Sequence, residues 1–280
     1  MPELPEVETV RAGLEPKLVG RRLERVEILD PRLTRPVDPA GVAAELEGER
    51  VAALDRRGKY LIVRFESGRV LLIHLRMTGQ LLHANGDSLP AEDAHRRAVV
   101  RLDDGSDVIY RDVRRFGTWQ LLEPDEVERH LAERLGREPL VRAFTSKRLA
   151  EALTGRRAPV KAVLLDQRRI AGVGNIYADE ALWRARVHPL KPAAELAVEE
   201  IAALHRGIRA ALRAGIARQG ATLSNYRTSD GSPGTMQEEF RVYGRTGEPC
   251  ERCGTPIEKI RAAGRGTWYC PRCQPHCPAP

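Results

Sequence analysis

The stretch "CERCGTPIEKIRAAGRGTWYCPRC" (residues 250–273) holds two C-x-x-C pairs, Cys250 with Cys253 and Cys270 with Cys273. The 16 residues that separate the pairs fall within the spacing of four-cysteine zinc ribbons. Each pair lets two thiolates approach one ion from a tight turn, and four sulfurs complete a tetrahedral shell with no open position. The stretch therefore predicts a small hairpin held by a structural metal ion.

Two disulfides are the alternative use of these cysteines. Glu3 and Glu6 interrupt the apolar run that a secretion signal needs near the N-terminus. No stretch approaches the roughly 18 consecutive apolar residues of a membrane-spanning helix. We therefore expect a cytoplasmic protein with reduced thiols, without a membrane partner. Cys277 lies outside the pattern, and we expect it to be a free thiol.

The charge of the chain favours a polyanionic partner. The net charge is +7 and the isoelectric point is near 9.4. Residues 241–280 alone carry seven Lys or Arg against three Glu. A zinc hairpin that bears Lys259, Arg261 and Arg265 suits insertion into a DNA groove, and contact with another protein is the alternative.

The first half of the chain is predicted to consist mostly of strands. Short apolar runs are separated by turn-forming segments such as "ESGR" (66–69) and "DDGS" (103–106), a pattern typical of a sandwich or barrel. The runs are "VEILD" (26–30), "YLIVRF" (60–65), "RVLLIHL" (69–75), "AVVRL" (98–102), "DVIYR" (107–111) and "TWQLLE" (118–123).

The second half is predicted to be helical. Pro159 can begin one helix, Asn175 can cap a second, and Gly220 can end a long amphipathic third. The segment "GVGN" (172–175) could present backbone N–H groups to a phosphate, although such glycines also form ordinary turns. Residues 223–240 are rich in Gly, Ser, Thr and Asp, and their length favours a functional lid.

The first six residues, "MPELPE", combine a helix start with a reactive terminus. Removal of Met1 would leave Pro2 with a secondary α-amine. An α-amino group has a reference pKa of about 8, against about 10.4 for lysine, so part of it is nucleophilic near neutral pH. Such an amine can form a charged iminium with an aldehyde-like carbon. An ordinary helix start without chemistry is the alternative.

Together these motifs resemble those of bacterial formamidopyrimidine-DNA glycosylases, in the same order and from Pro2 to Cys273. They are "MPELPEVET" (1–9), "GKYL" (58–61), "HLRMTG" (74–79), "RRFG" (114–117), "GVGNIYADEALW" (172–183), "SDGSPG" (229–234) and the cysteine tail. The resemblance implies an α+β multidomain fold. Its parts are an N-terminal β-sandwich flanked by helices (1–135), a linker (136–150), a helix-two-turn-helix domain with a damaged-base loop (151–240), a zinc finger (241–275) and a tail (276–280).

The resemblance also implies a bifunctional glycosylase and AP lyase that removes 8-oxoguanine and formamidopyrimidines from duplex DNA. Its expected partner is DNA with 8-oxoguanine opposite cytosine, its cofactor one structural zinc ion, and its state a monomer in the cytoplasm, associated with the nucleoid through DNA.

Individual roles follow from the resemblance. Pro2 is the nucleophile at C1′, Glu3 the general acid and base, and Lys59 the group that assists β-elimination. Arg265 grips phosphates beside the lesion and assists δ-elimination. The implied DNA contacts are His95, Arg114, Arg156, Lys161 and Asn175, and the zinc ligands are Cys250, Cys253, Cys270 and Cys273.

A base must leave the stack before C1′ can be attacked, and the vacated space must be filled. Met77, Arg114 and Phe116 resemble the family's three void-filling residues, and apolar wedges of this kind hold a kinked duplex. Two positions depart from the family pattern: Arg76 replaces a common glycine and Val113 a common proline.

Two alternatives were weighed against this function. An endonuclease VIII-like glycosylase for oxidised pyrimidines typically begins "PEGPE", whereas this chain has Leu4. A zinc protein that binds DNA without catalysis would not need Pro2, Glu3 and Lys59 together.

Overall fold

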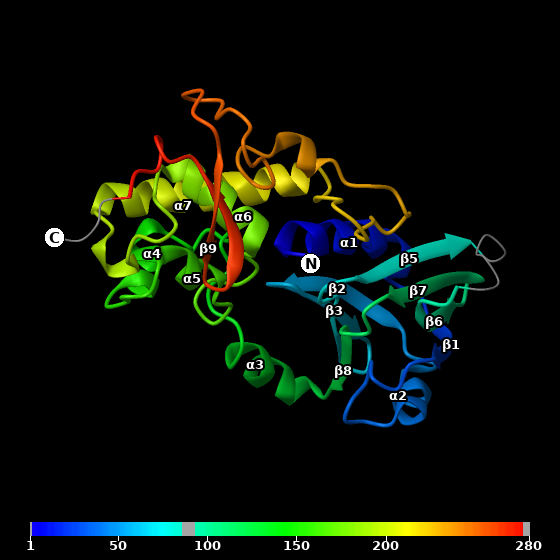
Figure 1. The fold of residues 1–280 in the computed structure, drawn as a ribbon. Coiled ribbons are helices and arrows are strands. Elements are labelled where there is room, and N and C mark those ends of the chain that lie inside the picture. The colour runs from blue at the N-terminus through cyan, green and yellow to red at the C-terminus, as the bar shows by residue number, and fades with distance from the viewer. Residues whose placement is uncertain (1, 86–92, 277–280) are drawn as a thin grey trace. The chain divides into compact units, whose positions relative to one another are not determined.

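The computed structural model describes residues 2–85 and 93–276, so Cys277 lies outside the described residues. The chain forms two compact units (Figure 1). The first unit comprises Met1–Ala132 and Arg218–Thr235, and the second comprises Glu133–Ala217 and Met236–Pro280. The segment 218–235, which the sequence grouped with the helical domain, packs with the N-terminal strands.

Two antiparallel four-stranded sheets form most of the first unit, in the orders β1-β6-β7-β5 and β2-β3-β4-β8. The strands are β1 (Leu23–Ile28), β2 (Val51–Arg57), β3 (Tyr60–Phe65), β4 (Val70–His74), β5 (Gly79–Asn85), β6 (Arg96–Leu102), β7 (Ser106–Asp112) and β8 (Thr118–Leu122). The helices of this unit are α1 (Leu4–Leu18), α2 (Pro39–Leu46) and α3 (Pro124–Ala132).

One apolar cluster joins both sheets to α1. Val100 of β6, Leu61 of β3 and Leu14 of α1 all belong to it, and each is almost completely buried. Because two sheets that share one core in this way form a sandwich, the predicted fold class is confirmed. The apolar face of α1 is also buried, and its residues are Leu4, Val7, Val10, Leu14 and Leu18.

The strands β2 and β5 were not predicted from the sequence. In β2 the buried residues Val51 and Leu54 are three apart, because the strand is irregular at its start. Strand β5 begins at Gly79 and buries the polar Gln80. Neither strand shows the alternation on which the sequence prediction depended.

The second unit contains four α-helices among its described residues. They are α4 (Ser146–Leu153), α5 (Val160–Leu165), α6 (Asn175–Ala185) and α7 (Val198–Ala217), with 3-10 turns at Ala193–Glu195 and Met236–Glu239. The amphipathic prediction for α7 is confirmed by the burial of Leu204, Ile208 and Leu212. No helix in the described ranges is long and apolar enough to span a membrane.

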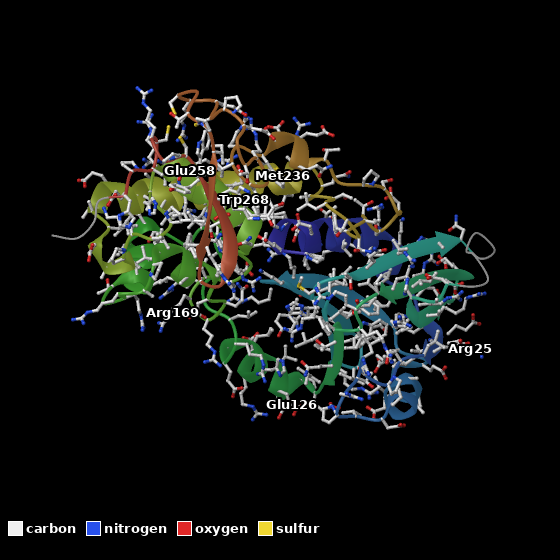
Figure 2. All side chains as sticks on the ribbon, viewed as in Figure 1. Arg25, Glu126, Arg169, Met236, Glu258 and Trp268 are labelled. Carbon is white, nitrogen blue, oxygen red and sulfur yellow. The ribbon has the colours of Figure 1, made fainter. Side chains whose placement is uncertain are left out.

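A two-stranded hairpin completes the second unit. Strand β9 (Glu258–Ala262) pairs antiparallel with β10 (Arg265–Tyr269), and Figure 2 labels one residue of each, Glu258 and Trp268. The connecting residues Ala263 and Gly264 have φ values of 51° and 73°. Positive φ at both central residues is the requirement of a type I′ turn, which matches the twist of a hairpin.

Candidate active site and DNA-binding surfaces

The N-terminus of α1 places Pro2 and Glu3 in buried positions. Glu3 stands at the N-cap, and its backbone N–H donates to Glu6 Oε2 at 2.8 Å. The other oxygen of Glu6 accepts the N–H of Ala221 at 2.9 Å. This buried carboxylate therefore fixes the start of the helix and joins it to the segment 218–235.

Lys59 lies in the turn between β2 and β3 and is only 4% exposed. Gly58, directly before it, has a φ of 58°, a backbone conformation that favours glycine. Arg56 donates to the Gly58 carbonyl at 3.1 Å and to Glu8 of α1 at 2.8 Å. The turn that carries Lys59 is thus attached to the helix that begins at Glu3.

The segment 218–235 is attached to the same unit by its backbone. The Tyr226 hydroxyl donates to the Gln219 carbonyl at 3.0 Å, and burial raises the pKa of this phenol. The N–H of His83 in β5 donates to the Ser229 carbonyl at 2.7 Å. The candidate damaged-base loop therefore rests on α1 and β5.

Asp112 organises the loops that carry the predicted void-filling residues. Its carboxylate, which is 1% exposed, accepts the N–H of Arg114 at 3.2 Å and that of Gly117 at 2.8 Å. It also accepts the hydroxyl of Thr78, the residue after Met77, at 2.5 Å. One buried carboxylate therefore holds both the Met77 loop and the loop that contains Phe116.

Gly117 is needed at its position, because a Cβ there would lie 1.6 Å from the Tyr110 hydroxyl oxygen. The neighbouring Phe116 is 52% exposed, and the Arg114 guanidinium carbon lies 4.7 Å from the centre of its ring. His95 is half-buried. It lies next to Asp112, because its carbonyl accepts the N–H of Asp112 at 2.9 Å. Three predicted DNA-contact residues are thus grouped around Asp112.

A groove of about 570 Å³ lies beside these loops, and we call it the arginine groove. Its lining residues are Arg32, Arg35, Arg76, Met77, Arg115, Phe116, Gly117 and Thr118. Arg115 pairs with Asp30 through two contacts of 2.6 and 2.8 Å. Among the described residues, no carboxylate forms an ion pair with the other three arginines, so the groove presents unpaired positive charge.

Both predicted wedge residues follow an arginine in the left-handed backbone region. Arg76 precedes Met77 with a φ of 52°, and Arg115 precedes Phe116 with a φ of 59°. This region favours glycine, which gives a physical reason for the glycine that the family commonly has at position 76. At position 113 the structure places an exposed Val113 and gives no reason for the departure.

The four predicted zinc ligands come together in the second unit. Their sulfur atoms all lie within 4.8 Å of one another, with separations of 3.5 to 3.9 Å among the contacting pairs. Disulfide sulfurs would be about 2.05 Å apart, whereas zinc–sulfur bonds of about 2.3 Å in a tetrahedron place sulfurs about 3.8 Å apart. The donor set therefore fits one structural zinc ion and excludes the disulfide alternative.

Helix α6 supports this metal site. The Trp183 indole N–H donates to Cys250 Sγ at 3.4 Å. The Arg252 guanidinium stacks 3.7 Å from the centre of the Trp183 ring and donates to the Trp183 carbonyl at 2.6 Å. Such contacts orient a thiolate ligand and attach the zinc loop to the helix.

Of the other predicted DNA-contact residues in the second unit, two are exposed and one is half-buried. Arg265 is exposed directly after the hairpin turn, and Arg156 is exposed between α4 and α5. Both positions suit contact with phosphates. Asn175 was predicted to cap α6, but Gly174 caps it and Asn175 is the first helical residue. Its side chain donates instead to the Gly266 carbonyl at 3.0 Å.

Lys161, for which the resemblance implies a phosphate contact, lies inside the second unit. Its side chain is completely buried, and Nζ lies 2.6 Å from Asp179 Oδ1, 2.7 Å from Thr267 Oγ1 and 3.3 Å from the Gly266 carbonyl. A lysine ammonium has three N–H donors, and the acceptors on α6 and β10 suit them. The side chain of Lys161 therefore has protein partners on α6 and β10, whereas its phosphate contact stays a prediction.

Sequence reasoning missed three buried carboxylates: Glu6, Asp112 and Asp179. Glu6 could have been found, because a carboxylate three residues after an N-cap is the spacing of a capping box. Asp179 lies four residues after Asn175 and so on the same helix face. Asp112 gave no local signal, since its partner Thr78 lies 34 residues earlier in the sequence.

Comparison with known proteins covers nearly the whole chain. The models of the formamidopyrimidine-DNA glycosylase N-terminal domain and H2TH domain match residues 1–119 and 135–227, and that of a zinc finger found in FPG and IleRS matches 247–275. A formamidopyrimidine-DNA glycosylase of Roseiflexus sp. is 49% identical over 98% of this chain and 100% of its own length.

Solved structures of the Lactococcus lactis Fpg are similar to this chain at 40% identity, covering 98% of this chain and 100% of theirs. One is a complex with DNA that contains an abasic site, with a TM-score of 0.91. Another is a complex with DNA that contains an oxidised pyrimidine, with a TM-score of 0.90.

Proposed function

The chain belongs to the formamidopyrimidine-DNA glycosylase family, and from this premise we propose that it excises oxidised purines from duplex DNA and then cleaves the strand. It acts as a glycosylase of base-excision repair with AP lyase activity. The preferred substrate is 8-oxoguanine opposite cytosine, and the active form is a cytoplasmic monomer associated with the nucleoid through DNA. The observation that carries this function is the buried Pro2–Glu3 start of α1, held by Glu6.

The chemistry begins at Pro2 once Met1 has been removed. The secondary amine attacks C1′, the bond from C1′ to the base breaks, and its electron pair leaves with the base, which takes up a proton. Glu3 protonates the ring oxygen as the sugar opens, leaving an iminium between the proline nitrogen and C1′. Loss of a C2′ proton breaks the C3′–O bond and expels the 3′ phosphate, with Lys59 assisting. Loss of a C4′ proton then breaks the C5′–O bond and expels the 5′ phosphate, with Arg265 assisting, and water hydrolyses the iminium to free Pro2.

The surfaces described above suit a flipped nucleotide. Met77, Arg114 and Phe116 occupy the space that the base leaves, and Arg114 can bond the orphaned cytosine. The arginine groove beside them attracts the DNA backbone. In the second unit Arg156, Asn175 and Arg265 approach phosphates around the lesion, and the zinc ion holds the hairpin.

The two alternative functions are not favoured. Family models and a full-length relative carry the formamidopyrimidine-DNA glycosylase name. The Lactococcus lactis structure with an oxidised pyrimidine shows that the relative accommodates such DNA, so lesion preference needs a direct comparison.

The function is tested by strand scission on labelled duplexes that carry 8-oxoguanine opposite cytosine, an oxidised pyrimidine, or no lesion. The protein that begins at Pro2 should cut the 8-oxoguanine duplex fastest and leave the undamaged duplex intact. The matched control is the same chain with one residue left ahead of Pro2, which should bind but not cut. Equal scission by this extended protein would contradict the assignment of Pro2.

A further inference from the structure

The strongest unexplained feature of the second unit is the Lys161–Asp179 ion pair. Both side chains are completely buried, and they join α5 to α6 at 2.6 Å. Removing two charges from water is costly, and an apolar pair of similar volume is often equally stable or more stable. Stability alone therefore does not account for this pair.

The partners of the pair all lie in the hairpin strand that carries Arg265. Lys161 donates to the Thr267 hydroxyl and the Gly266 carbonyl, while Asp179 Oδ2 accepts the N–H of Trp268 at 3.1 Å. The three consecutive residues after Arg265 are therefore all held by side chains of α5 and α6.

Strand β10 pairs with β9 along one edge. Along the other edge Lys161 and Asp179 hold Gly266, Thr267 and Trp268, and the Asn175 side chain of α6 adds a hydrogen bond to the Gly266 carbonyl at 3.0 Å. A slip of β10 by one residue would turn each of its side chains to the other face. The pair supplies the contacts to Thr267 and Trp268 in this register, and Asn175 shares the contact to Gly266. The pair thus helps to determine on which face of the hairpin the exposed Arg265 lies.

We propose that Lys161 and Asp179 are positioning residues for Arg265: they hold β10 in register against α6 so that the Arg265 guanidinium reaches the phosphates beside the lesion. This role is an alternative to the direct phosphate contact predicted for Lys161. The inference rests on the proposed function, because the contact that it positions is the one assigned to Arg265 there.

The test is a double-mutant cycle on binding, which requires no chemistry. The probe is a duplex with a tetrahydrofuran abasic analogue, and the four proteins are the wild type, Lys161→Met/Asp179→Leu, Arg265→Ala and the combination. Replacing both charges avoids the unpaired Asp179 that Lys161→Met alone would leave. Zinc content and the thermal midpoint are measured for each protein.

The pair replacement and Arg265→Ala should each weaken binding about tenfold, the scale of one charge-assisted hydrogen bond. Because the pair acts through Arg265, the combined variant should bind DNA almost as well as Arg265→Ala alone, within about twofold. A further tenfold loss in the combination would overturn the inference. If Lys161 instead contacted a phosphate, the pair replacement would also lower the slope of log affinity against log salt by about 0.9.

Two variants keep the test decisive. Thr267→Val retains both charges and removes only the hydroxyl that Lys161 contacts. It tests the inference even if the Lys161→Met/Asp179→Leu protein fails to bind zinc. It should weaken binding about fivefold when Arg265 is present and not at all with Arg265→Ala, which is the scale of one neutral hydrogen bond. An equal loss in both backgrounds would overturn the inference.

The matched control is Lys191→Met/Glu200→Gln, which removes a half-buried 2.7 Å pair of the same unit that does not contact the hairpin. It should leave binding unchanged. Strand scission by the wild type at a natural abasic site is measured alongside. If the binding effects of the pair replacement and Arg265→Ala are not additive, but the wild type does not cut the strand, the proposed function is wrong. The positioning inference then still stands.

Discussion

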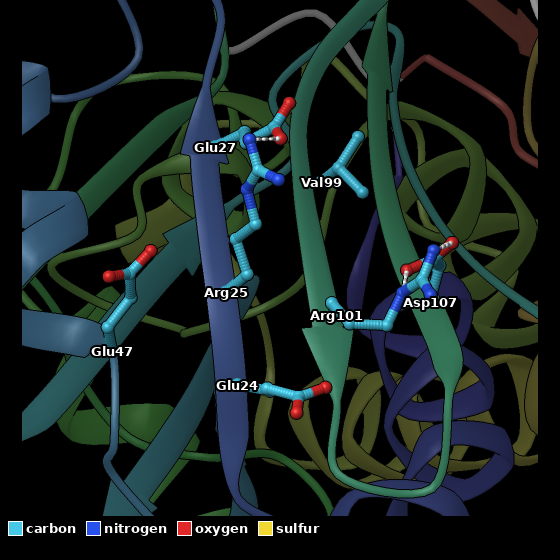
Figure 3. A pocket seen from close by; sticks show the side chains of 7 residues that line it. All are labelled: Glu24, Arg25, Glu27, Glu47, Val99, Arg101 and Asp107. Atoms are coloured by element: carbon cyan, nitrogen blue, oxygen red, sulfur yellow. Dashed lines mark hydrogen bonds and ion pairs between the residues drawn. The ribbon is translucent and has the colours of Figure 1, made fainter.

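Two grooves of the first unit are nearly equal in size and opposite in charge. The arginine groove encloses about 570 Å³, and a groove on strands β1, β6 and β7 encloses about 550 Å³ (Figure 3). We call the second the charge-paired groove, and its lining residues are Glu24, Arg25, Glu27, Glu47, Val99, Arg101 and Asp107. Its arginines are both neutralised, Arg25 by Glu27 at 2.8 Å and Arg101 by Asp107 at 2.5 Å.

The difference shows that size does not identify a DNA-binding surface. Four carboxylates surround two arginines in the charge-paired groove, so a phosphate would be repelled there. The arginine groove has four cations, and within the described part of the chain only Arg115 has an ion-pair partner, Asp30. Only this groove also carries the exposed apolar side chain of Phe116 beside Met77.

The largest effect is expected from removing the unpaired charge. Arg32→Gln/Arg35→Gln/Arg76→Gln should weaken binding to abasic-analogue DNA about a hundredfold near physiological salt and lower the salt slope by about 2.7, or 0.9 for each phosphate contact. Titrations by fluorescence anisotropy at several salt concentrations measure both quantities. The control, Arg25→Gln/Arg101→Gln, should change neither, and an equal loss in the two proteins would remove the distinction between the grooves.

The apolar residue of each groove gives the next comparison. Phe116→Ala should weaken binding to lesion DNA about tenfold, because an aromatic side chain against a base contributes about 1–3 kcal/mol. Its folding stability should change by less than about 0.5 kcal/mol, since the side chain is 52% exposed. Val99→Ala in the charge-paired groove should leave DNA affinity unaltered. A Phe116→Ala protein with full affinity would show that this ring is not a wedge.

Within the arginine groove, paired and unpaired arginines should behave differently. Arg76→Gln should lower the salt slope by about 0.9, as expected for a charge that meets a phosphate. Arg115→Gln should lower it by less, because Asp30 already compensates the Arg115 charge. Equal slopes for the two variants would mean that Arg115 leaves Asp30 when DNA binds.

The smallest effect concerns acid stability. Hydrogen bonds from Arg115 hold the pKa of Asp30 below its ordinary value of 3.8. A carboxyl whose pKa is lowered by folding stabilises the protein above that ordinary value, and the contribution is lost as the pH falls through the folded-state pKa. The urea midpoint of Asp30→Asn should therefore fall less between pH 7 and about pH 3 than that of the wild type. An identical fall would exclude a contribution from this pair.

Much of the fold could be predicted from local patterns. The cysteine spacing indicated the metal hairpin, and the apolar positions of α7 were buried as expected. Short runs and turns predicted a sandwich or barrel, and the family resemblance implied the sandwich. Strands β2 and β5 were missed because irregular pairing and a buried Gln80 removed the alternation that marks a strand.

The site was less predictable, because its geometry depends on partners that are distant in sequence. Lys161 resembles a phosphate ligand by position, yet Thr267, 106 residues later, takes its hydrogen bond. Arg32 and Arg35 stand in no motif and became notable only when the fold placed them beside Met77. Residue type and spacing identified the chemistry of this chain, whereas the supporting contacts required the structure.

The central claim is that Pro2 is the nucleophile, and covalent trapping tests it most directly. The protein that begins at Pro2 is incubated with an 8-oxoguanine:cytosine duplex and borohydride, which reduces an iminium to a stable amine. Mass spectrometry of the digested product should then find the DNA fragment attached to the Pro2 nitrogen. Trapping at Lys59 or another amine, or strand scission without any adduct at Pro2, would contradict the account.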